Sequence, residues 1–276
     1  NFKNKESPFF KKFIYRDKNF WPYIRVYLIN KLYNQETVTI YKSTNVKRFI
    51  KDFFRIIYSF KNLKQKENLF LIANRNEVNN LLKQFNIQNK IDDKNSVYMS
   101  FKGNSNYLNK NYFYFDFFKI YFRVISSLIF FKHRNKSSKY IVKKYFLEGV
   151  LFYYFYKCIF WFIKPKNIYL INWYNYYPAI LGNNSAKIHE IQHGIIHKSH
   201  WGYNLNCNID IDIPNVFHLW DSFSKDNISI GNQTINYKYF KKIFQFSTDG
   251  DRSTCVIISQ FSIKRQLNDF LIENIH

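Results

Sequence analysis

Two kinds of apolar segment alternate along most of the chain. Short continuous apolar runs are typical of strands buried on both faces, and they occur at residues 69–73, 97–101, 167–173, 186–192, 216–220 and 228–230. Longer apolar stretches suit helices, and they occur at residues 20–32, 50–60, 77–85, 112–132, 140–163 and 176–181. This alternation of strands and helices predicts an α/β domain.

A polar stretch, TDGD at residues 248–251, divides the chain. Before it, residues 238–246 suit either a basic aromatic helix or an extended link. After it come a short apolar run at 255–259 and a helical stretch at 263–275, which together predict a strand followed by a helix. We therefore expect a first domain over residues 1–247 and the opening βα unit of an incomplete second domain over 248–276.

The chain is strongly basic, with 42 Lys and Arg against 19 Asp and Glu and a formal charge of +23. Such a surface suits polyanions, including nucleic acids, anionic lipids and phosphorylated substrates. The alternative is compositional background, because Asn, Lys, Ile, Phe and Tyr are abundant while Gly, Pro and Ala are scarce. The basic residues are spread along the chain and form no recognisable nucleic-acid motif, so nucleic acid is not an expected partner.

Cysteine usage and apolar length bear on the compartment. Cys158, Cys207 and Cys255 form no close pair, which fits a reducing cytoplasm. The first residues are charged, and we expect no signal peptide there. The longest apolar stretch, residues 145–163, is interrupted by Glu148 and Lys157, so it does not contain the roughly 18 consecutive uncharged residues of a membrane span. It predicts a buried helix or, alternatively, a face resting on an anionic membrane surface.

Five of the seven histidines fall between His189 and His218. His189-Glu190-Ile191-Gln192-His193 spells H-E-x-x-H, the zinc-peptidase pattern, which works only when a helix puts both imidazoles on one face. Gly194 follows the second histidine directly and would end such a helix. We therefore expect no metal, and we interpret residues 186–192 as a strand.

In a strand, His189 and Glu190 point to opposite faces and cannot share a metal ion. His193 and Gly194 then lie at the carboxyl end of the strand, where open α/β sheets bind ligands. His197 and His200 line the loop that follows. A structural hydrogen bond is the competing role for each histidine, above all for His189 and His218.

One block of this region resembles a known family motif. Residues 190–196, EIQHGII, followed by His200-x-Gly202-Tyr203, resemble a motif of bacterial glycosyltransferases that build cell-surface polysaccharides with the two-domain GT-B architecture. Weaker similarities follow in matching order, at residues 20–25, 164–170, 219–221, 230–232 and 256–260.

The resemblance implies a Rossmann-like GT-B N-terminal domain that transfers sugar from a nucleotide-activated donor to a glycan or lipid-linked acceptor in capsule or lipopolysaccharide assembly. It implies His193 as the catalytic base, with His197 or His200 as alternates. It further implies a substrate-binding set of Gln192, Gly194, His197, His200, Gly202, Tyr203, Gly231, Asn232 and Gln260. No metal or other cofactor is expected. Asp210 and Asp212 spell D-x-D, but we interpret them as solvated residues. The enzyme would be cytoplasmic, with an option of peripheral binding to the inner membrane face.

The chain departs from this family in two ways. Trp201 stands where Pro or Leu is usual, and most of the second domain, which holds the nucleotide, is missing after His276. The chain also begins at Asn1 and has a single Met, Met99, so we expect a fragment of a longer protein. The alternatives are a non-catalytic binding module, a zinc hydrolase and a charge-driven nucleic-acid binder.

Overall fold

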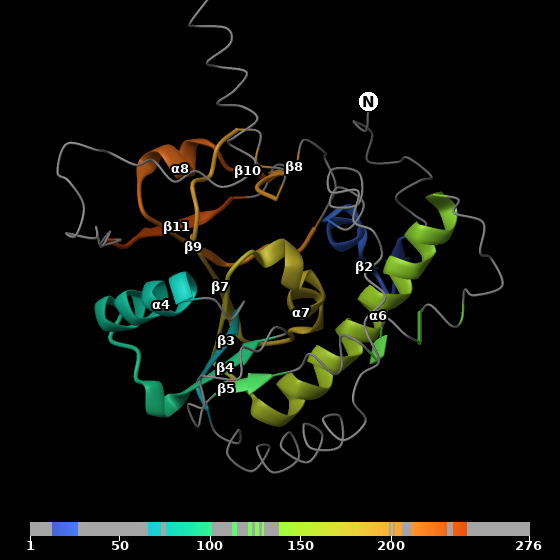
Figure 1. The fold of residues 1–276 in the computed structure, drawn as a ribbon, viewed down its shortest axis with the longest axis horizontal. Helices are drawn as coiled ribbons and strands as arrows, with labels where there is room; N and C mark the ends of the chain where they lie inside the picture. Colours follow the sequence, from blue (N-terminus) through green and yellow to red (C-terminus); the bar gives the residue numbers. More distant parts are fainter. Residues whose placement is uncertain are drawn as a thin grey trace, which may run out of the picture. The chain divides into compact units, whose positions relative to one another are not determined.

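A computed structural model describes residues 13–26, 66–72, 76–100, 112–114, 121–122, 125–126, 129, 138–198, 200, 202–205, 211–230 and 234–241 (Figure 1). The chain divides into two compact units, residues 1–242 and 243–276, and all described residues belong to the first. The expected second domain, including Gln260, lies outside the described residues and stays a prediction. The same holds for the helix expected at 50–60 and for Gly231 and Asn232.

The described part is an α/β unit built on one seven-stranded sheet. Its strands are β3 (Asn68–Ile72), β4 (Ser96–Ser100), β5 (Tyr112–Tyr114), β6 (Asn167–Leu170), β7 (Lys187–Ile191), β9 (Val216–Leu219) and β11 (Asn236–Tyr239). The described helices are α4 (Asn76–Gln88), α6 (Ser138–Ile163), α7 (Tyr177–Gly182) and α8 (Ser222–Asp226), with 3-10 turns η1 (Asp93–Asn95) and η3 (Trp173–Tyr176). Two smaller pairings complete it: β1 (Ile14–Tyr15) with β2 (Lys18–Asn19), and β8 (Asn204–Leu205) with β10 (Ser229–Ile230).

Every pairing in the large sheet is parallel, and the strands lie in the order β11-β9-β7-β6-β3-β4-β5. Numbered by their order along the chain, the strands from β5 to β11 read 3-2-1-4-5-6-7. Doubly wound α/β folds have this order, in which the direction of winding reverses between strands 1 and 4. The predicted α/β class is thus confirmed, and the sheet is compatible with a Rossmann-like domain whose switch point lies between β3 and β6.

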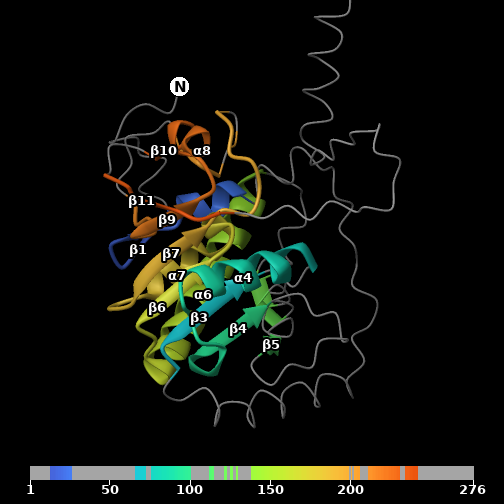
Figure 2. The ribbon, with the colours of Figure 1, turned by 90° about the vertical axis from the view of Figure 1, so that its left-hand side faces the viewer.

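Alternation along the strands divides the core into two layers. Leu69 and Leu71 of β3 pack with α6, α7 and the short helix at residues 21–26, whereas Phe70 and Ile72 pack with α4. The helices therefore cover both faces of the sheet, as a parallel sheet requires (Figures 1 and 2). Because β3, β6, β7 and β9 are buried on both faces, they are largely continuous apolar runs, and this is why they could be recognised in the sequence.

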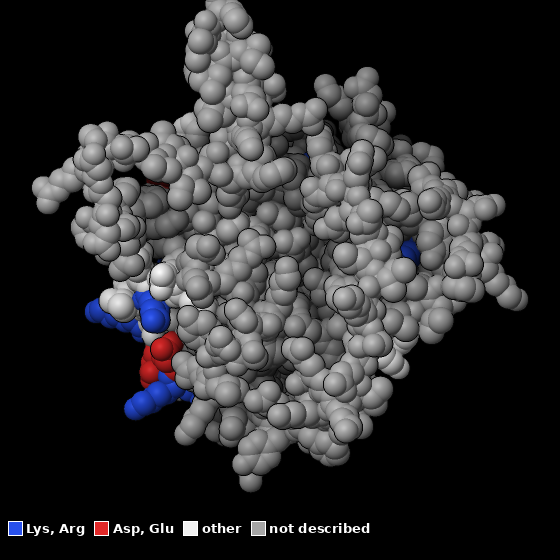
Figure 3. Space-filling model, in the orientation of Figure 1, with Lys and Arg blue, Asp and Glu red and all other residues white. Residues whose placement is uncertain are grey.

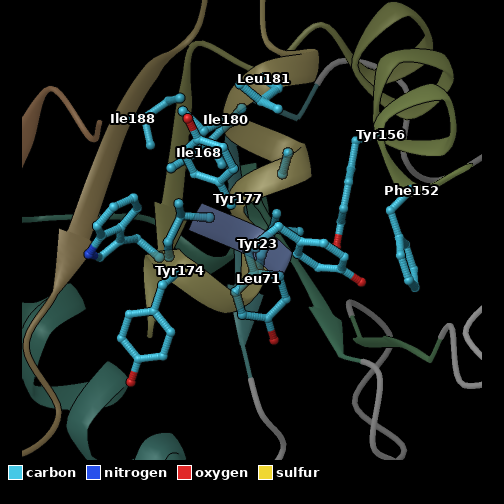
Figure 4. Close-up of a cluster of buried hydrophobic side chains, with 14 of the residues drawn as sticks. Tyr23, Leu71, Phe152, Tyr156, Ile168, Tyr174, Tyr177, Ile180, Leu181 and Ile188 are labelled. Carbon is cyan, nitrogen blue, oxygen red and sulfur yellow. The ribbon is translucent and has the colours of Figure 1, made fainter. Parts of the chain in front are cut away.

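The larger core layer is rich in aromatic side chains. Tyr23, Phe152, Tyr156 and Tyr177 lie there against the aliphatic strand residues (Figure 4). Gly182, the last residue of α7, allows α7 to approach α6 closely, because a Cβ there would lie 3.1 Å from the Tyr153 carbonyl oxygen. The result is a rigid helical layer directly behind the turn that follows β6.

Three sequence expectations need correction or completion. Residues 112–114 were expected to begin a helix but form β5, because their Tyr and Phe side chains suit an extended edge beside β4. Residues 236–239, partly expected as a helix or link, form strand β11. The β1–β2 hairpin was not expected, since its turn uses Arg16 and Asp17 at positive φ in place of the usual Asn-Gly or Asp-Gly.

The helix expected at 140–163 is α6. Its residues Val142–Ile163 are long and apolar enough to cross a membrane by length and composition, and they form the single such helix among the described residues. However, 44% of its most apolar window is buried within the protein. One face of α6 is therefore buried in the core, as predicted for a core helix.

Candidate functional site

The H-E-x-x-H segment is extended, as predicted, so the zinc-peptidase geometry does not form. Residues Lys187–Ile191 make up β7, which lies between β6 and β9. His189 and Glu190 consequently face opposite layers of the core, and His193 lies beyond the strand end. Among the described residues, no group of three or more His, Cys, Asp or Glu side chains is arranged to hold a metal ion.

His189 forms a buried pair with His218 of β9. Its Nδ1 lies 3.0 Å from His218 Nε2, its Nε2 lies 3.3 Å from Asn167 Oδ1, and its ring stacks on Tyr169 at 4.7 Å between centroids. Burial lowers the pKa of His189 to about 4 and that of His218 to about 3, and the nearby charges of Lys187 and Lys238 act in the same direction. Both rings are therefore neutral at pH 7, and one donates to the other. Their structural role, one of the two considered from the sequence, is confirmed.

Glu190, on the other face of β7, is a fully buried carboxylate held by three donors. The hydroxyl of Tyr203 donates to Oε1 at 2.5 Å, the Asn172 N–H donates to Oε1 at 3.1 Å, and the Trp173 N–H donates to Oε2 at 3.0 Å. Burial raises the pKa of Glu190 to about 8, and these hydrogen bonds limit the rise. The carboxylate thus joins β7 to two other segments at the carboxyl edge of the sheet.

The turn after β6 is one of these segments. Asn172 has φ 65° and ψ 63°, a left-handed conformation that Asn adopts more readily than most residues. Its Oδ1 accepts a hydrogen bond from the Tyr174 hydroxyl at 2.8 Å. The turn lies beside the switch point of the sheet, where doubly wound folds bind ligands.

Gln192 links the ends of β7 and β9. Its Nε2 donates to Gly194 O at 2.9 Å and to Ser224 Oγ at 2.7 Å, while its Oε1 accepts from the Trp220 N–H at 2.8 Å. With only 1% of its surface exposed, its amide is occupied by the protein itself. Gln192 therefore shapes the loop that carries His193 and Gly194, both half-buried directly after the strand.

The segment from His197 to Asn204, which we call the histidine loop, folds back on itself. The His200 N–H donates to His197 O at 2.8 Å, and the N–H groups of Tyr203 and Asn204 donate to His200 O at 3.0 and 3.1 Å. The side chain of Asn204 also donates to His197 O at 3.2 Å. These bonds bring His197, His200, Gly202 and Tyr203 together, as the sequence suggested, with the two imidazole rings 5.8 Å apart between centroids.

The protonation state of His200 follows from its contacts. Burial lowers its pKa to about 4, so the ring is neutral at pH 7, and the pKa of His197 is lowered for the same reason. The Gly202 N–H donates to His200 Nδ1 at 3.2 Å, which leaves the ring proton on Nε2. In this state His200 can donate a hydrogen bond from Nε2–H to a phosphate or hydroxyl oxygen. It is less suited to act as a base, because its Nδ1 already accepts from the Gly202 N–H.

Gly202 allows the histidine loop to contact the β6 turn. A Cβ at this position would lie 2.3 Å from a ring carbon of Tyr174, closer than any real contact. The rings of Tyr174 and Tyr203 meet edge to face at 5.8 Å. Nothing in the sequence pointed to Asn172 or Tyr174 in this site, and Glu190 was recognisable only as part of the H-E-x-x-H and EIQHGII stretches.

Comparisons with known proteins add no identification: no protein family, no curated protein and no solved structure matches this chain.

Proposed function

We propose that this chain is the acceptor-side half of a GT-B glycosyltransferase. It would move a sugar from a nucleotide-activated donor to a glycan or lipid-linked acceptor in capsule or lipopolysaccharide assembly. One observation carries the proposal: Glu190 and Ile191 end the central parallel strand β7, and residues 192–194 follow at the carboxyl edge of the sheet, one strand from the switch point. Ligands bind at this edge in open α/β sheets.

The chemistry of sugar transfer suits the groups found there. An acceptor hydroxyl needs a base within hydrogen-bond reach, and His193, half-buried at the strand end, is the candidate. The departing phosphate needs donors, which the Nε2–H of His200 and the neighbouring His197 could supply. Gly194 leaves room for close approach of a ligand to the backbone. Within this proposal Gln192, Gly202 and Tyr203 act by shaping the loop.

The test is binding and transfer by the full-length protein, including the expected second domain, with a panel of nucleotide sugars and lipid-linked acceptors. We expect saturable binding of one nucleotide type in preference to others. His193→Ala should lose transfer while its unfolding midpoint stays unchanged, and Ile195→Ala, exposed on the same loop, should behave as wild type.

Two results would count against the proposal. If the full-length protein binds a glycan or lipid-linked acceptor but no nucleotide sugar, a non-catalytic binding module replaces the transferase. If His193→Ala transfers sugar at the wild-type rate, the base has been assigned to the wrong residue.

The proposal also includes a cytoplasmic location with peripheral contact to an anionic membrane. Trp161, near the end of α6, is 76% exposed, and Lys164 and Lys166 follow it. An exposed indole beside lysines suits a lipid headgroup region. Nucleic acid is not a proposed partner. At the lower left of the face in Figure 3, described basic and acidic side chains lie next to one another.

A further inference from the structure

Glu190 is buried, and among the residues that the structure describes no cation pairs with it. The groups that influence its ionisation are the Tyr203 hydroxyl and the two backbone N–H groups of Asn172 and Trp173. The ionisable side chains facing it are thus Tyr203 and, through its charge, Tyr174. His200 lies beyond the Tyr203 ring, at 4.9 Å between centroids, and the His189–His218 pair lies on the opposite face of the sheet. A buried carboxylate of this kind depends wholly on its hydrogen bonds.

Those bonds reach the histidine loop through a single side chain. The Tyr203 ring packs on Tyr174 and Phe217, and its backbone N–H closes the turn on His200 O. Its hydroxyl is the link between that turn and β7. The position of His197 and His200 therefore follows from where the Tyr203 ring is held.

We propose that Glu190 is the positioning residue of the histidine loop. Its carboxyl group fixes Tyr203 against the turn after β6, and loss of its hydrogen bonds loosens the loop while the sheet stays folded. The inference rests on the proposed function only in that the loop is the ligand-binding element. The structural relation between Glu190 and the loop stands without it.

The proposal includes a response to pH. A protonated Glu190 must donate its proton, and two of its three neighbours are backbone N–H donors, which cannot accept it. The remaining acceptor is the Tyr203 hydroxyl oxygen, so protonation reverses the hydrogen bond between the two side chains. Because burial raises the pKa of Glu190 to about 8, the closed loop favours the protonated form, so the loop is held most firmly below about pH 8 and loosens as the carboxyl ionises.

Amide hydrogen exchange of the whole chain tests the positioning role. In Glu190→Gln, the amides of His200, Tyr203 and Asn204, each bonded within the loop, should exchange at least about tenfold faster than in wild type, which is the ratio that about 1.4 kcal/mol of local stability gives. Tyr203→Phe, which keeps the ring but removes the hydroxyl, is the milder second variant and should act in the same direction.

Tyr98→Phe is the matched control. The Tyr98 hydroxyl donates to Asp93 Oδ1 at 2.5 Å, the same kind of bond at the same distance as that between Tyr203 and Glu190, but between β4 and η1. It should raise exchange throughout the sheet without a preference for the loop. If Glu190→Gln and Tyr203→Phe give the same pattern as Tyr98→Phe, Glu190 is a general stabilising group and the proposal fails.

The pH response is read from the imidazole resonances of histidine-labelled protein, assigned by replacing each histidine in turn. The His200 resonance should show a step with its midpoint near pH 8 that is absent in Glu190→Gln. A His200 resonance without that step in wild type would overturn the pH response. Neither readout requires a nucleotide sugar, so a failure here is distinguishable from a failure of the transferase proposal.

Discussion

Replacing Gly202 with Ala tests whether the histidine loop is built against the β6 turn. The added Cβ would lie 2.3, 2.4 and 2.9 Å from three ring carbons of Tyr174. Ordinary carbon–carbon contacts lie at about 3.5–4.0 Å, so the ring or the loop must retreat by roughly 1.2 Å. Tyr174 is 7% exposed and packed on three sides by Trp173, His200 and Tyr203, so the retreat is not free.

The cost can be worked out in two parts. Overpacking of this kind costs about 1–3 kcal/mol. Moving the Tyr174 ring also endangers its hydroxyl bond to Asn172, worth about 0.5–1.5 kcal/mol. We expect Gly202→Ala to lower the free energy of unfolding by roughly 2–4 kcal/mol, measured by urea denaturation followed by circular dichroism.

A double-mutant cycle shows whether the Tyr174 ring is the cause. Tyr174→Leu removes the ring atoms that the new Cβ meets, so Gly202→Ala should cost about 1–3 kcal/mol less in that background. An equal cost in both backgrounds would place the strain elsewhere. A Gly202→Ala variant within about 0.5 kcal/mol of wild type would refute the close approach itself.

Three further outcomes follow from the described contacts. Gln192→Ala should lower the free energy of unfolding by about 2–4 kcal/mol in urea titrations, because it strips the Trp220 N–H and Gly194 O of buried partners; a loss under about 1 kcal/mol would contradict this. The pKa values of His189 and His218 are lower folded than unfolded, so their contribution to stability is present above about pH 6.5 and is lost as the pH falls toward 4; the urea midpoint should drop over this range, and less so when both are Gln. Trp161→Ser should weaken co-sedimentation with anionic vesicles at low salt relative to Phe223→Ala, which removes another exposed aromatic side chain, on α8. Equal sedimentation of the two variants would show that α6 does not contact the membrane.

The α/β class was predictable because the strands of a parallel sheet are buried on both faces and therefore consist of consecutive apolar residues. The strands β3, β4, β6, β7 and β9 all lie within or beside runs recognised in this way. The two strands of the large sheet that were not predicted, β5 and β11, do not stand out as separate apolar runs. Residues 112–114 precede a long aromatic region with no clear period, and β11 mixes Lys and Tyr because it is an edge strand with exposed side chains. Neither pattern separates an edge strand from a helix.

Only part of the candidate site could be derived from the sequence, since its members come from distant segments. His193, Gly194 and the loop histidines were recognisable because they follow a strand directly. Glu190 was recognisable only as a letter in H-E-x-x-H, because its partners lie 13, 17 and 18 residues away and approach it only when the sheet forms. No local pattern distinguishes a buried carboxylate with three donors from an exposed one.

The two-residue period of β7 therefore decides what the histidine cluster can do. It sends His189 into a buried pair with His218, where a low pKa keeps both rings neutral and structural. It sends Glu190 to the other layer, toward Tyr203 and the turn after β6. A one-residue shift in register would exchange these environments, placing an imidazole among three donors and a carboxylate between two lysines. The donors around Glu190 need two acceptor oxygens, which an imidazole cannot supply, whereas the His189 site suits a neutral ring that pairs with His218 through a ring nitrogen. The register of β7 is thus fixed by polar groups as well as by apolar burial.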